Sequence, residues 1–179
     1  MDAYCIIIDS RLMAARLPRC LATLNHAVAR YPDKVDIRVV SDDDNDSLAT
    51  LTRRIGAHFE PVPLRSIGAR GNEAVRRTPI NTLIFPTPRM HLIADWLDKV
   101  DHLLTHHQWD AVLLTPRRRP LPQGLKRLWQ RESGAGTLCV RRDWFERIGG
   151  FDPSLDESAH SDLLVRLRAC QARVLEFPL

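Results

Sequence analysis

The stretch Gly134–Leu167, with the sequence GAGTLCVRRDWFERIGGFDPSLDESAHSDLLVRL, decides the fold of this chain. Thr137 to Val140 is a short apolar run, which predicts a strand. Asp143 follows in a position to cap a short helix, because an aspartate oxygen can accept the unpaired N–H groups of a first turn. Gly149 predicts the end of that helix, since the residue after a helix often needs a positive φ.

An acidic loop and a second helix complete the stretch after Phe151. Ser161 can cap this helix, and leucines at helical spacing predict that one side of it is buried. Asp162 then falls in the first turn, at the mouth of the loop. The helix dipole stabilises an aspartate there whatever the protein does, so a purely structural role stays open beside a catalytic one.

The order of these pieces resembles the C-terminal half of family-2 glycosyltransferases, enzymes of the GT-A fold. In that family a strand runs into the motif RR-x-x-F-x-x-I-G-G-F-D, and a loop then leads to ED-x-x-L-x-x-R-L. The residues at matching positions are Arg141, Arg142, Phe145, Ile148, Gly149, Gly150, Phe151, Asp152, Asp162, Leu163, Arg166 and Leu167. Ser161 stands where the family has its glutamate. The resemblance implies that Asp162 is a general base, which takes a proton from an acceptor hydroxyl during inverting displacement at the anomeric carbon.

Length and composition indicate a globular chain. With 179 residues, of which 44% are hydrophobic and 27% charged, we expect one domain with a full core. No apolar run approaches the ~20 residues that cross a bilayer, and Asp2 stands where a signal peptide has basic residues. These features predict a cytoplasmic protein without a membrane span, and they leave the oligomeric state unknown.

Cysteines and basic residues argue against two further classes of protein. The four cysteines form no C-x-x-C pair, which predicts buried free thiols rather than a metal or disulfide role. The net charge is +4, and 23 of the 26 basic residues are arginine, whose planar fork suits phosphate. Positive charges are spread along the chain and aromatic residues make up only 6%, so we expect no nucleic-acid partner.

Apolar runs alternate with helical patterns through the chain. Tyr4–Ile8 and Val35–Val40 are typical of strands buried on both faces, and a helix at Leu17–Arg30 lies between them. Further strands are expected at His58–Val62, Asn81–Phe85, Asp110–Leu114 and Val174–Phe177, and further helices at Leu48–Ile55, after Gly68, at Arg89–His107 and at Leu125–Arg131. Strand–helix–strand units with short links predict an α/β fold with a mostly parallel sheet.

The acidic turn after the second predicted strand is the first candidate for a binding site. Ligands of open parallel sheets lie beyond the carboxyl ends of the strands. The turn resembles the family motif V-V-D-D-G-S-x-D, in which an aspartate contacts the base, so the resemblance implies that Asp42 and Asp46 hold a nucleotide. The alternative is a solvated turn in which Asp46 or Ser47 caps the next helix.

A second candidate lies at the start of the helix after Gly68. The sequence is similar to the family motif G-x-x-x-A-R-N-x-G, whose arginine and asparagine help to hold the nucleotide and its phosphates. Arg70 and Asn72 match these two residues, although Gly71 is inserted between them. Backbone N–H groups at a helix start can bind phosphate, and the alternative is an ordinary helix start with a permissive glycine.

The family's metal motif is replaced in this chain. After the strand at Asn81–Phe85 the family has F-L-D-x-D, whose two aspartates bring a divalent metal to the nucleotide diphosphate. This sequence has Pro86, Thr87 and Pro88 there. Proline offers no carboxylate, and Mg²⁺ or Mn²⁺ prefers oxygen ligands. No cofactor is therefore certain, and the change argues against the usual metal-dependent transfer.

Two basic features remain as candidates. Arg117, Arg118 and Arg119 lie between prolines in a predicted loop, where they can neutralise a diphosphate in place of a metal or form a basic surface loop. His102 and His106 lie four apart on a predicted helix and can share a metal, but no third ligand is specified, so a solvated polar face is the competing interpretation.

The whole chain therefore predicts a Rossmann-like α/β layer fold of the GT-A type. Residues 1–85 are expected to form the nucleotide-binding half and residues 86–179 the acceptor and catalytic half. The resemblance implies a glycosyltransferase that moves a sugar from a nucleotide-diphosphate sugar to an unknown acceptor, and the prolines at the metal motif predict that it is metal-independent. A catalytically inactive module that binds a nucleotide or a protein partner is the alternative. A nucleotidyltransferase of similar fold would have a glycine-rich loop after the first strand, and Ser10, Arg11 and Leu12 offer none.

Overall fold

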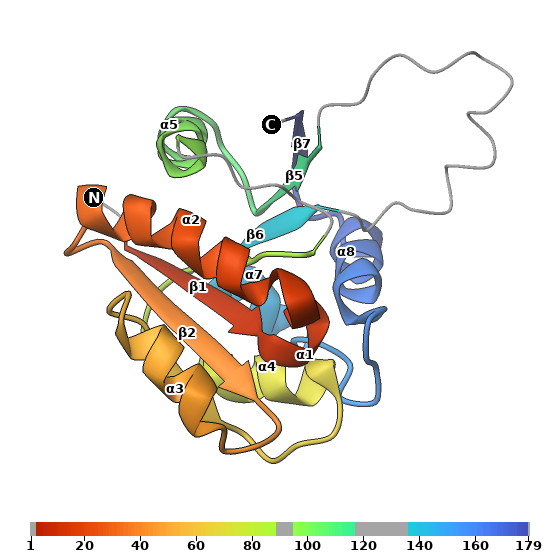
Figure 1. Cartoon of the computed structure of the whole chain (residues 1–179). Coiled ribbons are helices and arrows are strands. Elements are labelled where there is room, and N and C mark those ends of the chain that lie inside the picture. The colour runs from red at the N-terminus through yellow and green to blue at the C-terminus, as the bar shows by residue number, and fades with distance from the viewer. Residues whose placement is uncertain (1–2, 89–94, 117–135, 179) are drawn as a thin grey trace, which may run out of the picture.

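A computed structural model of the chain describes residues 3–88, 95–116 and 136–178 (Figure 1). The strands in these ranges are β1 (Tyr4–Asp9), β2 (Val35–Ser41), β3 (His58–Pro61), β4 (Thr82–Phe85), β5 (Ala111–Thr115), β6 (Thr137–Arg141) and β7 (Val174–Pro178). The helices are α1 (Ser10–Met13), the 3₁₀ helix η1 (Ala14–Arg16), α2 (Leu17–Arg30), α3 (Asp46–Arg53), α4 (Ile67–Arg76), α5 (Trp96–His106), α7 (Arg142–Arg147) and α8 (Ala159–Ala169). The predicted helix at Leu125–Arg131 lies outside the described residues, as does the first part of the one at Arg89–His107.

The described strands form one sheet in the order β3-β2-β1-β4-β6-β5-β7. Strand β1 pairs in parallel with both β2 and β4. The pair β2–β3 and the pair β5–β7 are also parallel. Only β6 runs against its neighbours β4 and β5 within this described sheet. The predicted mostly parallel α/β sheet is confirmed, and the reversed strand β6 begins where β1, β2 and β4 end.

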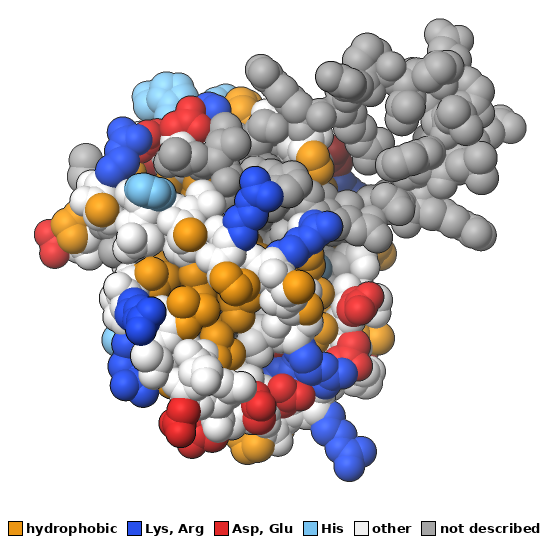
Figure 2. Space-filling model, viewed as in Figure 1, with side chains coloured by type: hydrophobic (Ala, Val, Ile, Leu, Met, Phe, Trp, Pro, Cys, Tyr) orange, Lys and Arg blue, Asp and Glu red, His pale blue; other side chains and the backbone are white. Residues whose placement is uncertain are grey.

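Apolar side chains cover both faces of the sheet, as expected for parallel strands. Successive residues of β1 alternate between two cores: Tyr4 and Ile6 join one, and Cys5 and Ile7 the other. Helices α2 and α5 complete the first core, and α4, α7 and α8 complete the second (Figure 1). Viewed from the same side, hydrophobic side chains gather at the middle of the surface and charged ones surround them (Figure 2).

Two predicted helix caps in the opening stretch are wrong. Helix α7 starts two residues earlier than predicted, with Arg141 at the N-cap, so Asp143 lies inside the first turn and accepts from Arg141 at 2.8 Å. Helix α8 starts after Ser158, and Ser161 lies within its first turn with its hydroxyl donating to the Ser158 carbonyl at 2.9 Å. Gly149 follows α7 with φ +84°, as predicted.

Candidate functional site

Asp42, Arg70 and Asn72 lie at one end of the sheet, and the loop that leads to α8 and Asp162 packs against α4 there. This carboxyl end is where β1, β2 and β4 stop and β6 begins. Acidic and basic side chains lie next to each other there, over the ends of β1 and β2 (Figure 2). Arg117, Arg118 and Arg119 lie outside the described residues.

Arg70 lies at the centre of this end and is fully buried. Its Nε donates to Asp9 Oδ2 at 2.6 Å and its Nη2 to Asp9 Oδ1 at 3.2 Å, while Nη1 donates to the carbonyls of Leu64 and Arg65. Asp9, which also caps α1 by accepting from the Leu12 N–H, is only 7% exposed. Arg70 therefore joins β1 to the loop before α4 and has few hydrogen-bond donors left for a ligand.

Asp42 and Asp46 lie on the solvent side of this buried pair. The Asp42 side chain is 38% exposed, 3.4 Å from Arg11 Nη1 and 3.9 Å from Arg70 Nη1. Asp46 is exposed at the first position of α3, and the cap of that helix is Asn45, whose side chain accepts from the Leu48 N–H at 2.9 Å. The alternative interpretation of Asp46 or Ser47 as the cap is wrong, because Asn45 already accepts the unpaired N–H.

Asn72 fixes the loop that follows α7. Its Nδ2 donates to the Phe151 carbonyl at 2.8 Å, and its Oδ1 accepts from the Phe151 N–H at 2.9 Å. A Cβ on Gly71 would meet the Phe151 ring at 2.8 Å, and one on Gly68 would meet the Asp152 carbonyl oxygen at 2.1 Å. The inserted Gly71 therefore receives the Phe151 ring, and α4 lies directly against the loop that leads to α8.

Asp162 lies in the first turn of α8, as predicted. Its Oδ2 accepts from Arg166 Nε at 2.8 Å, and Arg166 also donates from Nη1 to the Ile148 carbonyl at 2.9 Å. The Asp162 side chain remains 32% exposed, and its Oδ1 has no hydrogen-bond partner among the described residues. Arg166 thus orients a carboxylate that keeps one free oxygen.

His160 and Asp9 line a small cavity beneath this end of the sheet, and the sequence analysis named neither of them. The cavity of about 10 Å³ has room for about one water molecule. His160 Nδ1 is buried without a hydrogen-bond partner in the described part of the chain, and burial lowers the pKa of His160 to about 4. The rings of Phe85 and Phe151 pack against it, with centroids 6.0 and 5.1 Å away. The one sequence signal for Asp9 is its position directly after the first predicted strand.

The segment after β4 does not fit a divalent metal. The Thr87 hydroxyl is buried and donates to the Gly136 carbonyl at 3.2 Å, and the prolines on either side of it have no side-chain ligand atoms. The nearby carboxylate of Asp9 is bound on both oxygens by Arg70. Within the described ranges no three His, Cys, Asp or Glu side chains cluster closely enough to hold a metal, and this includes the region of His102 and His106.

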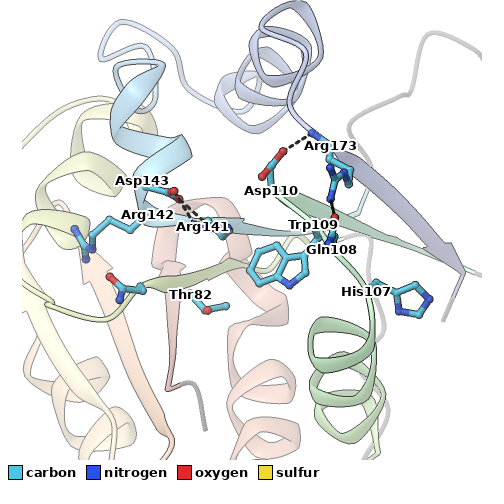
Figure 3. Close-up of a pocket in the computed structure, with 10 residues that line it drawn as sticks. Thr82, His107, Gln108, Trp109, Asp110, Arg141, Arg142, Asp143 and Arg173 are labelled. Atoms are coloured by element: carbon cyan, nitrogen blue, oxygen red, sulfur yellow. Dashed lines mark hydrogen bonds and ion pairs between the residues drawn. The ribbon is translucent and has the colours of Figure 1, made fainter.

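A wider cleft of about 670 Å³ lies at the opposite, amino end of the sheet (Figure 3). Its polar side chains pair largely with one another: Arg141 with Asp143, and Arg173 with Gln108, while the Arg173 N–H binds Asp110. None of the sequence-predicted site residues lines this cleft. Size alone therefore does not mark the candidate site in this protein.

Comparison with solved structures identifies the fold. Mannosyl-3-phosphoglycerate synthase from Rubrobacter xylanophilus matches with a TM-score of 0.74 at 15% identity, covering 99% of this chain and 65% of that one. A mannosyltransferase from Pyrobaculum calidifontis, in complex with GDP-Man and Mn²⁺, matches at 0.72 and 17% identity over 98% and 54%. Glucosyl-3-phosphoglycerate synthase from Mycobacterium tuberculosis, in complex with UDP, matches at 0.72 and 14% identity over 99% and 70%.

These likenesses show that the chain has the α/β fold of GT-A glycosyltransferases. The chain spans only about half to two thirds of the length of most of the structures it matches first. No protein-family model matches the sequence, and a comparison with curated proteins finds no significant match. Among the described helices, none has the length and hydropathy needed to cross a bilayer.

Proposed function

We propose that this chain binds a nucleotide-diphosphate sugar at the carboxyl end of the sheet and transfers the sugar to an acceptor hydroxyl with inversion. One observation carries the proposal: nearly the whole chain superposes on sugar transferases that were solved with GDP-Man or UDP. Residues 1–85 would supply the nucleotide site and residues 86–179 the acceptor and catalytic side, without a resident metal.

The proposed roles follow the contacts of each residue. Asp42 and Asp46 are exposed and would face the nucleotide. Arg70 and Asn72 are occupied by protein atoms, so they would serve the nucleotide by holding the loops around it. Arg117, Arg118 and Arg119 remain candidates for binding its diphosphate.

Asp162 would be the general base. As the acceptor oxygen attacks the anomeric carbon, Oδ1 of Asp162 takes the hydroxyl proton, and the electron pair of the breaking bond leaves with the nucleotide diphosphate. Arg166 would keep the carboxylate oriented through the 2.8 Å contact on its other oxygen.

Replacing Asp162 by asparagine tests this role. We expect Asp162→Asn to lower kcat about 10²- to 10⁴-fold while nucleotide affinity and Tm stay near those of the wild type, because only proton transfer is lost. Glu157→Gln, an exposed change in the neighbouring loop, is the control and should leave kcat unchanged. An Asp162→Asn protein with wild-type turnover would exclude this residue as the base.

A binding module without turnover is the second candidate. Two features favour it: Pro86 and Pro88 stand at the positions that the resemblance aligns with the metal ligands, and Arg166 already pairs with Asp162. Calorimetric titration with UDP, GDP and CMP, each with and without Mn²⁺, separates the candidates when it is joined to a transfer assay. Tight binding of one nucleotide with no transfer from any of its sugar conjugates would favour the module.

A further inference from the structure

The chain makes a strained turn immediately after α1. Ala14 has φ +44° and ψ −128°, and only one other non-glycine residue in the described ranges has a positive φ. A residue with a Cβ is disfavoured at such an angle, and strained backbone of this kind concentrates at functional sites. Ala14 is the C-cap of α1 and the first residue of η1, which ends at Arg16.

Arg16 reaches from this turn to the segment that replaces the metal motif. Its Nη1 donates to the carbonyl oxygen of Pro88, 72 residues further along the chain. Strands β1 and β4 are neighbours in the sheet, so the contact joins the segments that follow two adjacent carboxyl ends. Arg16 is exposed, and its other donors have no partner in the part of the chain that the structure describes.

The charge balance at this end sets Arg16 apart from two other arginines nearby. Arg11 pairs with Asp42, and Arg70 pairs with Asp9. Arg16 contacts no carboxylate among the described residues, so its charge is not neutralised. A guanidinium without a carboxylate partner among the described residues thus lies beside Pro88, in the segment that the resemblance aligns with the metal motif.

We propose that Arg16 binds the diphosphate of the nucleotide donor and so replaces the metal. The inference rests on the proposed function and assigns a residue that the sequence patterns did not. A guanidinium donates two parallel hydrogen bonds to phosphate oxygens, and such charge-assisted bonds are among the stronger ones in proteins. As the bond to the anomeric carbon breaks, Arg16 would stabilise the negative charge that the leaving diphosphate gains.

The experiment compares nucleotide affinity in three proteins, measured by calorimetry with UDP, GDP and CMP in the presence of EDTA. We expect Arg16→Gln to weaken binding of the preferred nucleotide diphosphate about 10- to 100-fold, which is the range for a lost charge-assisted hydrogen bond. Arg19→Gln removes the same charge from an exposed position on α2, and we expect its affinity to stay within about twofold of the wild type. Arg16→Lys keeps the charge without the fork and should fall between the two.

The possible results separate the inference from the proposed function. Equal affinity of the wild type and Arg16→Gln would overturn the inference while the nucleotide site stands. Binding by the wild type that appears only with Mn²⁺ would also overturn it. A wild type that binds none of the three nucleotides, with or without Mn²⁺, would remove the proposed function and the inference together. Melting curves of each variant check that loss of the Pro88 contact leaves the fold intact.

Discussion

An arginine links separate segments of the chain at each end of the sheet, but the two arginines have different partners. At the carboxyl end, Arg70 is fully buried and binds the buried carboxylate of Asp9. At the amino end, the Arg142 side chain is 16% exposed and donates to three backbone carbonyls, and its carboxylate partner among the described residues, Glu146, is 60% exposed. A buried ion pair is expensive to desolvate and adds little net stability. We infer that the buried pair at the carboxyl end positions β1 and the loop before α4, where we expect a charged ligand.

Replacing Arg70 and Arg142 in turn is the strongest test of the difference between the two ends of the sheet. We expect Arg70→Leu to lower the free energy of unfolding by about 3–5 kcal/mol, because the buried Asp9 side chain would lose the arginine that binds both of its oxygens. Arg142→Leu should cost about 1–3 kcal/mol, since it leaves carbonyl groups unsatisfied but no buried charge. Urea denaturation measures both, and the double variant Arg70→Leu with Asp9→Leu should recover part of the loss. A larger loss for Arg142→Leu would reverse the comparison.

The adjacent glycines at the end of α7 offer a finer test of the carboxyl end. Both have positive φ, but a Cβ on Gly150 would lie 2.6 Å from Asn72 Oδ1, whereas one on Gly149 meets nothing within 4 Å. We expect Gly149→Ala to cost about 1–2 kcal/mol through backbone strain alone. Gly150→Ala should cost about 3 kcal/mol, because it also forces Asn72 away from Phe151. Equal losses in urea denaturation would mean that the Asn72 contact contributes little.

The two ends should also respond differently to pH. The pKa of buried His160 is lowered to about 4, so between pH 6.5 and 4 the unfolded chain binds a proton that the native protein does not. Stability should therefore fall as the pH drops through this window, by at most about 3 kcal/mol, and His160→Leu should flatten that part of the profile. His107→Gln, an exposed change at the amino end, is the control and should leave the slope unchanged. If the stability of His160→Leu still falls with pH in this window, other titrating groups cause the fall.

Much of the fold could be predicted because periodicity is a local signal. The bounds of α2 were predicted in full, as Leu17–Arg30, because apolar residues recur at helical spacing. The caps at Asp143 and Ser161 were wrong because each helix begins earlier, after Arg141 and Ser158, and the side chains of these two residues make no capping hydrogen bond that a local pattern could reveal. Cap choice depends on where the neighbouring strand or loop ends, which the local pattern does not specify.

The sequence named the residues of the candidate site but not the contacts that these residues make. Three separate motifs supplied these residues by resemblance: one gave Asp42, a second gave Arg70 and Asn72, and a third gave Asp162. Their partners lie far away in sequence: Asp9 is 61 residues from Arg70, and Phe151 is 79 residues from Asn72. Such pairings follow from the strand order rather than from local spacing, so a single sequence could not supply them.

The hydrogen bonds between the Asn72 side chain and the Phe151 backbone also have a consequence for synthesis on the ribosome. Helix α4 is complete once Arg76 is made, but the ring that fills the space at Gly71 emerges 75 or more residues later. Synthesis proceeds at about 5–20 residues per second, so the face of α4 that carries Gly71 is without the Phe151 ring for roughly 4–16 s. During this interval the Gly71 position on α4 lacks the Phe151 ring, so we expect the nascent N-terminal half to be open to chaperone binding there.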